Sequence, residues 1–587
     1  MQKKRNRGAT LIEVVLGVGL IFMLFGGLFL FYRSVVDVLS NTDLRTMGTA
    51  ILNKEMETVR NLPFDQVGTQ GGIPSGVLQQ IKIATTTTDR VFAIKTTVRN
   101  IDDPFDGILG GNPNDTAPAD YKLVELEATC TTCPNFIPLI LTARIAPKNL
   151  ESSANSGSLF VNVINAGGAP VPGASVHVVN TSTTPAIDLT DTTNQNGVLQ
   201  LVGVPTSTQG YQVTVTKVGY STDQTYPVGV PANPNPIVGH LSVLAQTLTP
   251  VTFQIDLLAP FVMETKDAFC AGVGSQPFVI TGSKLIGTDP DIIKFSTSSQ
   301  TGVDGTKVYA GIEWGSHAFS YSGGYDLLGT LPLTPAYIAP ATNAVFAFIL
   351  RAADPNSLLI TVKEGVSGAP IPGATVELTK TGFSGAKKTG EFYRSQTDWS
   401  AGTYSEQSGV DPVGTPGIIT MAYGAGGYST TSVAYLISET LDFGATSTTY
   451  GNVLWNPASQ PGSTGADSLR LQFAANSDDT TWNFIGPDGT AGTFYTSSSV
   501  ALHASLTNNR YFRYKVLLST EDAGTTPELR DLTVYFSGPC VPLGQVLFQN
   551  LSAGTYFAEA TVPGYLPATS SISVSGEWTQ AEINLSP

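Results

Sequence analysis

Residues 158–179 read SLFVNVINAGGAPVPGASVHVV, and residues 357–378 repeat the pattern as SLLITVKEGVSGAPIPGATVEL. In each copy a Pro/Gly motif, GAPVPGA or GAPIPGA, separates two runs in which side chains alternate with period two. This pattern is typical of a strand, a tight turn and a second strand. Proline presets φ for such a turn, and glycine takes conformations that other residues avoid. The stretch therefore predicts paired β-strands wherever it recurs.

The second half of this unit also recurs. Strand-like runs follow Gly197, Gly305 and Gly544, and each run ends in Gly-Tyr: Gly219-Tyr220, Gly324-Tyr325 and Gly564-Tyr565. A further apolar run then closes each copy, at 251–257, 345–350 and 579–585. Three copies of one unit predict three related β-modules in tandem.

This order of motifs resembles the carboxypeptidase regulatory-like and Cna B-type family. The resemblance implies prealbumin-like β-sandwiches without a peptidase centre, used as stalks, spacers or carbohydrate- and protein-facing modules on cell surfaces. We expect the first module at 157–258 and a second, related module at 259–352. The third is expected in two pieces, 356–385 and 541–587.

The third module is interrupted by an insert. The first copy takes 23 residues from Ala174 to Gly197, whereas the corresponding step from Ala374 to Gly544 takes 170. Exposed loop tips accept such insertions. We expect an inserted β-sandwich domain at 386–540, and its pattern resembles discoidin- or laminin-G-like jelly rolls. Its expected strands are 468–474, 510–518 and 526–536.

Composition agrees with a mainly β protein and excludes several functions. Charged residues make up 13% of the 587 residues, and there are 60 Gly and 37 Pro, which favours short strands and turns over long surface helices. The net charge of −15, without a basic stripe, excludes nucleic-acid binding. Four His without partners at metal spacing, and no G-x-S-x-G, P-loop or HExxH motif, predict a chain that is not an enzyme and has no cofactor and no metal site.

The N-terminus is of a different kind. It reads MQKKRNRGATLIEVVLGVGLIFMLFGGLFLFYR, and no residue from 14 to 32 is charged. A helix over that span is roughly 28 Å long, about the thickness of the hydrocarbon core of a bilayer. The basic flank predicts a cytoplasmic N-terminus. The apolar pattern continues at helical spacing until Pro63 ends it.

A Gly, four uncharged residues and a single acid, Gly8-Ala9-Thr10-Leu11-Ile12-Glu13, precede the apolar run. It resembles the prepilin signature of type IV pilins and pseudopilins. The resemblance implies cleavage by a membrane peptidase between Gly8 and Ala9, and methylation of Ala9. It also implies that Glu13 pairs with the α-amino group of a neighbouring subunit. Ala9 departs from the family's usual Phe, and a plain signal anchor with an interfacial Glu is the alternative.

The same resemblance gives the first part of the chain its expected layout. Residues 1–8 form a leader peptide, residues 9–62 the N-terminal helix with its membrane span at 14–32, and residues 63–150 a pilin-like α+β head. The expected head strands are 91–99, 121–128 and 137–145.

The cysteines and one acidic loop leave alternatives open. Cys130 and Cys133 form a lone CxxC, which predicts a local disulfide in an oxidising compartment, or else a metal site. The sequence does not say whether Cys270 and Cys540 meet. The loop at 102–107, DDPFDG, is read as a turn, with Ca²⁺ binding as the alternative.

Two further site hypotheses concern the modules. In the Cna B-type family a first-strand Lys joins a last-strand Asn through a buried acid, and Lys363, Glu559 and Asn584 stand at matching places. The alternative is that all three face solvent. In the insert, Trp455, Trp482, Phe484 and Tyr495 either stack on sugars or fill a sandwich core.

Together these features predict a minor type IV pilin or pilin-anchored surface adhesin, a single-pass protein with its bulk at the cell surface or in a pilus. Its expected partners are other pilin subunits, prepilin peptidase, the membrane and a carbohydrate or protein ligand. The alternatives are a pseudopilin of a type II-like secretion or DNA-uptake system and a membrane-tethered glycan-processing enzyme.

Overall fold

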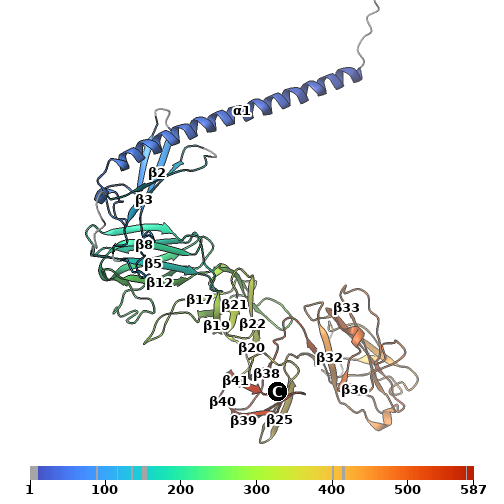
Figure 1. Cartoon of the computed structure of the whole chain (residues 1–587). Helices are drawn as coiled ribbons and strands as arrows, with labels where there is room; N and C mark the ends of the chain where they lie inside the picture. The colour runs from blue at the N-terminus through green and yellow to red at the C-terminus, as the bar shows by residue number, and fades with distance from the viewer. Residues whose placement is uncertain are drawn as a thin grey trace, which may run out of the picture. The chain divides into compact units, whose positions relative to one another are not determined.

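One helix and a series of antiparallel and mixed β-sheets make up the computed structural model, which describes residues 11–86, 90–115, 117–133, 136–147, 155–399, 402–412, 417–576 and 578–587. The chain divides into a first unit of residues 1–257 with 285–292, and a second unit of 258–284 with 293–587. Figure 1 shows the helix at the blue end of the chain and strands throughout the rest. The mainly β fold class with a long N-terminal helix is confirmed.

The head of the first unit is a helix packed on a four-stranded antiparallel meander. Helix α1 (Leu11–Arg60) ends three residues before Pro63, and a 3-10 turn, η1 (Phe64–Gln66), follows it. The sheet has the order β1-β2-β3-β4, and its strands are β1 (Ile81–Thr85), β2 (Val91–Ile101), β3 (Tyr121–Cys130) and β4 (Leu139–Ile145). The three strands expected in the head correspond to β2, β3 and β4.

Lys122 is a buried cation in this head. Its side chain is 5% exposed, its Nζ donates to the carbonyl of Phe64 at 2.7 Å, and it lies over the Phe64 ring. Burial lowers the pKa of Lys122 to about 8, because a low-dielectric site disfavours the charged form.

The buried Lys122 makes the head more stable as the pH rises. The pKa of Lys122 in the folded state lies below the ordinary value for lysine. Between about pH 8 and pH 10 the unfolded state therefore binds more protons at this residue than the folded state does. We expect the free energy of unfolding of the head to increase by about 2 kcal/mol across that window, measured by urea unfolding with pulse proteolysis. Lys122→Met should flatten the increase, whereas Lys95→Met, at an exposed position of β2, should keep it. If the free energy of unfolding of the Lys122→Met variant still increased with pH, another titrating group would be responsible for the increase.

The first module is a sandwich of two sheets in the first unit. One sheet has the order β12-β5-β8, and the other has the order β10-β9-β6-β7 with β11 beside β9. The strands are β5 (Ser156–Ile164), β6 (Ser175–Asn180), β7 (Ile187–Thr192), β8 (Val198–Pro205), β9 (Ser207–Thr216), β10 (Asp223–Gln224), β11 (Leu241–Val243) and β12 (Leu248–Gln254). First strand β5 pairs in parallel with last strand β12, and apolar side chains from both sheets meet in one core.

Polar contacts join the head to the first module. The Arg99 guanidinium donates two hydrogen bonds, of 2.8 and 2.6 Å, to the Asp191 carboxylate. The amide of Asn100 donates to the carbonyl of Val202 at 2.8 Å. A bidentate pair with a mostly buried acid fixes orientation as well as distance, so the head and the first module are held in register within their unit.

The second module repeats the strand pairing of the first and adds one strand, β20, beside its last strand. Its strands are β13 (Ala259–Lys266), β14 (Pro277–Gly282), β17 (Ser296–Gln300), β18 (Thr306–Ile312), β19 (Gly315–Tyr321), β20 (Tyr325–Leu331), β21 (Ala336–Ile338) and β22 (Ala344–Ala352), in sheets β18-β13-β22-β20 and β17-β14-β19-β21. The first strand β13 again pairs in parallel with the last strand β22. A separate hairpin is made by β15 (Leu285–Gly287) and β16 (Ile292–Ile293).

The third module has the same arrangement in two pieces of chain. Its strands are β23 (Leu358–Glu364), β24 (Thr375–Lys380), β25 (Phe383–Lys388), β38 (Gln545–Phe548), β39 (Gly554–Thr561), β40 (Ala568–Val574) and β41 (Thr579–Leu585), in sheets β38-β23-β41 and β25-β24-β39-β40. Strand β23 pairs in parallel with β41. Strand β25 reaches Lys388, so residues 386–388, expected in the insert, complete a sheet of the third module.

Each module has a buried threonine whose hydroxyl forms hydrogen bonds with backbone groups of the turn after the first strand. In the first module the Thr193 hydroxyl accepts from the amide of Ala174 at 2.9 Å and donates to the carbonyl of Val171 at 2.7 Å. In the second module the Thr301 hydroxyl accepts from the amide of Gln276 at 3.0 Å. In the third module the Thr389 hydroxyl accepts from the amide of Ala374 at 3.0 Å and donates to the carbonyl of Ile371 at 2.6 Å. The repeated unit thus includes a polar anchor that satisfies backbone groups inside the sandwich.

These threonines also show where the insert enters. Residues 194–196 and 302–304 make the short turns between the threonine and the following glycine in the first two modules. In the third module the same step, from Thr389 to Gly544, holds residues 390–543. The amide of Gly390 donates to the carbonyl of Gln545 at 3.1 Å, which keeps the two ends together. A whole domain therefore replaces one three-residue turn.

The insert contains two larger sheets and one small sheet. Their orders are β26-β37-β32-β34, then β27-β30-β35-β31 with β33 beside β35, and β28-β29-β36. The strands are β26 (Phe392–Gln396), β27 (Tyr404–Ser408), β28 (Val410–Asp411), β29 (Ile419–Met421), β30 (Ala434–Ser438), β31 (Leu441–Asp442), β32 (Thr449–Asn456), β33 (Leu469–Asn476), β34 (Val500–Ala501), β35 (Tyr511–Leu518), β36 (Glu528–Leu529) and β37 (Asp531–Ser537), with 3-10 turns η2 (Gly462–Thr464) and η3 (Ala504–Leu506).

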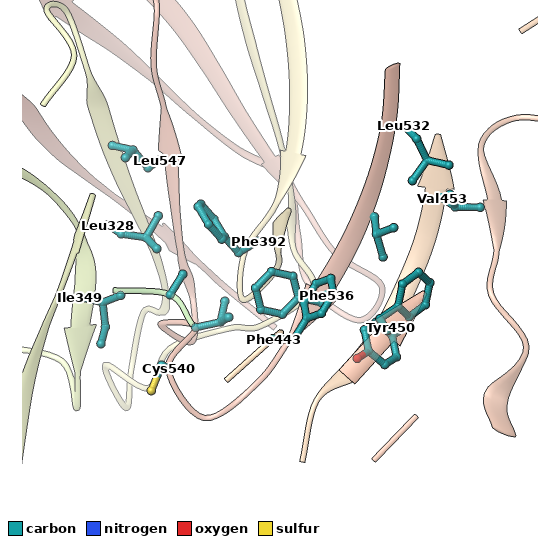
Figure 2. Close-up of a cluster of buried hydrophobic side chains, with 14 of the residues drawn as sticks. Leu328, Ile349, Phe392, Phe443, Tyr450, Val453, Leu532, Phe536, Cys540 and Leu547 are labelled. Carbon is teal, nitrogen blue, oxygen red and sulfur yellow. The ribbon is translucent and has the colours of Figure 1, made fainter. Parts of the chain in front are cut away.

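Inside the second unit, the insert and the second module share one hydrophobic cluster. Figure 2 shows Leu328 and Ile349 of the second module on one side and Phe392, Phe443 and Phe536 of the insert beside them. Leu547 of the third module belongs to the same cluster. The insert is therefore packed against its neighbours as well as being covalently continuous with the third module.

Candidate functional site: the N-terminal helix and the covalent links

The first half of α1 offers an uncovered apolar surface. Every side chain that the structure describes from Ile12 to Asp43 is exposed, and Leu44 is the first buried one. The apolar residues among them include Phe22, Phe25, Phe29 and Phe31, each at least 64% exposed. Among the described helices, α1 is long and apolar enough to cross a membrane. Such a surface requires lipid or other apolar helices around it.

The second half of α1 is fixed to the head. Leu44, Gly48, Leu52, Met56 and Val59 are buried at steps of three or four residues, which places them on one face of the helix. A Cβ atom at Gly48 would lie 2.9 Å from the Leu139 side chain, so glycine permits the helix to approach the sheet closely. The helix therefore has an uncovered part and a part that is built into a folded domain.

Of the three residues in the expected processing and assembly signal, the structure describes Glu13. Gly8 and Ala9 lie outside the described residues. Glu13 is the third residue of α1, within its first turn. Processing between Gly8 and Ala9 and the role of Glu13 in assembly therefore remain predictions of the sequence.

Two disulfides link the described cysteines. Cys130 and Cys133 are bonded at the end of β3, the local pairing expected from the CxxC. Cys270 and Cys540, 270 residues apart, are also bonded, a pairing that sequence spacing did not reveal. Cys270 follows β13 in the second module and Cys540 follows β37 of the insert, so this bond ties the two together. Both bonds indicate an oxidising environment for the β-domains.

Of the three residues of the possible isopeptide bond, two come together and the acid does not. Lys363 and Asn584 are partners on the parallel strands β23 and β41, and Lys363 Nζ forms an ion pair with Glu582 at 2.5 Å. Glu559 lies on β39 in the opposite sheet, where Tyr556, Ala558 and Ala560 face the core instead. The acid is thus on the far side of the sandwich from the lysine.

The acidic loop of the head is a compact cluster of carboxylates. Asp102 accepts from the amide of Leu109 at 2.9 Å, and one oxygen each of Asp102 and Asp115 is buried without a hydrogen-bond partner. Burial and the nearby acids raise the pKa values of Asp102 and Asp120. Within the described residues, no group of three or more His, Cys, Asp or Glu side chains is arranged to hold a metal ion.

Of the four aromatic residues named in the insert, two fill its core. Trp455 and Tyr495 are each 2% exposed. Trp482 and Phe484 are partly exposed, and the Arg513 guanidinium lies 4.5 Å from the centre of the Trp482 ring. The core interpretation therefore holds for Trp455 and Tyr495.

No protein-family model matches the chain and no curated protein matches it. Among solved structures it is similar to the TIE protein of Bacillus anthracis, at 9% identity over 87% of this chain and 76% of that chain, with a TM-score of 0.14. A streptococcal ancillary pilin matches at 10% identity over 73% and 98% of the two chains, with a TM-score of 0.14. The minor pilin of Streptococcus agalactiae matches at 12% identity over 34% and 97%, with a TM-score of 0.16. Likenesses of this size define no family for the chain.

Proposed function

We propose that the chain is a membrane-anchored, pilin-like surface protein, most specifically a minor type IV pilin that carries its β-modules outward. The observation that supports this best is the two-part helix α1. Its first half exposes apolar side chains, and its second half is buried against the head sheet. A signal sequence needs no such second half, whereas a subunit that packs helix against helix needs both parts.

Glu13 supplies the register of assembly in this proposal. A carboxylate inside an apolar helix is costly unless a cation pairs with it. After cleavage behind Gly8, the α-amino group of Ala9 in a neighbouring subunit is such a cation. The rest of the chain then serves for display: three sandwiches of one topology and an insert, fastened by disulfides suited to the cell exterior.

The N-terminus of the mature protein tests this function. We expect Edman sequencing and mass spectrometry to give Ala9, carrying one methyl group, as the first residue. Gly8→Val should block cleavage and filament entry while leaving membrane insertion intact. Glu13→Leu should permit cleavage but lower incorporation into filaments at least tenfold by immunogold counting. A mature chain that begins at Met1 would reduce the segment to a signal anchor.

A further inference from the structure

We propose that a cavity in the second unit, between the second module and the insert, binds an acidic saccharide through Arg351. The cavity measures about 730 Å³ and is lined by residues 267–271, the end of β22 and the start of β26. Ligand sites in proteins typically measure about 300–1,000 Å³. The proposal rests on the display function only for its setting at the cell surface.

The walls of this cavity are held in place before any ligand arrives. The Cys270–Cys540 disulfide fastens one wall to the insert. The neighbouring Phe269 ring packs against Phe392, Phe443 and Phe536 with centroid distances of 6.1, 6.2 and 5.5 Å, and the last three rings appear together in Figure 2. A preorganised site loses little conformational entropy when a ligand binds.

Both carboxylates that line the cavity are already engaged. Asp442 accepts two hydrogen bonds of 2.8 Å from the Arg510 guanidinium. Asp267 accepts from the backbone amides of Phe269 and Ala271, each at 2.9 Å. The charges of both acids also act on the Arg394 guanidinium, whereas no ion pair with Arg351 is formed among the described residues.

Among the three arginines that line the cavity, Arg351 is the one that leaves a positive charge there. Arg394 donates to the backbone carbonyl of Asp442 at 2.6 Å, and the charges of Asp442 and Asp267 act on its guanidinium. The Arg351 guanidinium has no hydrogen-bond or ion-pair partner within the described ranges. It lies over the rings of Phe392 and Tyr393, with its central carbon 5.1 and 5.2 Å from their centroids. In a chain of net charge −15, this places an unpaired cation where a ligand can reach it.

The shape and chemistry of the lining indicate which anion fits. A guanidinium presents parallel N–H groups that match the two oxygens of a carboxylate. Tyr325 and Tyr393 add rings that are apolar on their faces and polar at their hydroxyls. A pyranose that bears a carboxylate offers both features, an apolar ring face for a tyrosine and an anion for Arg351. Tyr325 belongs to the Gly-Tyr motif of the second module, so a repeat residue acquires a role in binding.

The test measures binding of uronic-acid disaccharides to the full chain in detergent. Isothermal titration calorimetry with glucuronate- and galacturonate-terminated disaccharides should give at least one ligand that binds tenfold or more tightly than its neutral hexose counterpart. Arg351→Gln should remove this preference, and Arg351→Lys, which keeps the charge but lacks the fork, should keep part of it. Arg530→Gln, at an arginine of the insert that pairs with Glu528, should bind like the unaltered chain.

Several results would overturn the proposal. These are no binding of either acidic disaccharide, equal binding of acidic and neutral sugars, a preference that persists in Arg351→Gln, or an acidic hexapeptide that binds more tightly than the sugars. Unchanged thermal midpoints and an intact Cys270–Cys540 bond, checked by peptide mapping, would show that the variants are folded. Because this assay does not involve processing or filaments, its failure leaves the proposed anchor untouched.

Discussion

Replacing Cys270 and Cys540 by serine is expected to lower the free energy of unfolding of the second unit by about 4 kcal/mol. The bond links residues 270 positions apart, and in the chain-entropy model a cross-link stabilises more as the loop that it closes grows longer. It also fastens the loop after β13 to the end of β37, so its loss frees the second module to separate from the insert. Because all five Trp lie in the second unit, their fluorescence during guanidinium unfolding reports on it directly.

The chain provides its own control for this measurement. Cys130 and Cys133 close a loop of sequence separation three, and their bond lies in the first unit. Replacing that pair by serine should leave the tryptophan-detected transition unchanged. A Cys270/Cys540 variant that unfolds at the same guanidinium concentration as the unaltered chain would mean that packing alone, through the cluster around Phe392 and Phe536, holds the insert in place.

Much of the fold could be predicted because its signals are local. Strand-like runs predicted three of the four head strands within a few residues but missed β1, and the expected strand 579–585 coincides with β41. The repeat predicted that the modules share a topology. The hydrogen-bonding role of the buried threonines could not be predicted, because one buried Thr among many in Ser/Thr-rich loops has no local pattern. Their equivalence is shown by the hydrogen bonds that Thr193, Thr301 and Thr389 each accept from a backbone amide.

Contacts between distant parts of the chain could not be predicted. The Cys270–Cys540 pairing depends on how the insert folds back on the second module, and no spacing encodes it. The same packing brings Arg351 of β22 to Tyr393 of β26. Conversely, Lys363, Glu559 and Asn584 matched a family pattern in sequence, but strand alternation sends Glu559 outward from the sheet opposite the lysine.

Gly197→Ala is expected to destabilise the first module by about 3 kcal/mol or more. Gly197 has φ +71°, in the left-handed region, and a Cβ atom there would lie 2.5 Å from the carbonyl oxygen of Val163. That carbonyl belongs to β5, whose Val163 amide donates to the carbonyl of Gly197 at 2.8 Å. The backbone around Val163 or Gly197 would have to move to accommodate the Cβ atom. The loss of stability therefore exceeds the cost of placing alanine in the left-handed conformation. Hydrogen exchange of peptides from β5 and β8, followed by mass spectrometry, measures the change.

Gly168→Ala, in the same module, separates the cost of the left-handed conformation from the cost of the close backbone contact. Gly168 also lies in the left-handed region, at φ +81°, but a Cβ atom there would meet nothing within 4 Å. This variant should therefore lose only about 1 kcal/mol, the cost of the left-handed conformation for alanine. Gly305 and Gly544 share the positive φ and the close backbone contacts of Gly197, so their alanine variants should resemble Gly197→Ala. If instead all four variants cost the same, the left-handed conformation and not the close packing would explain why the repeat keeps glycine there.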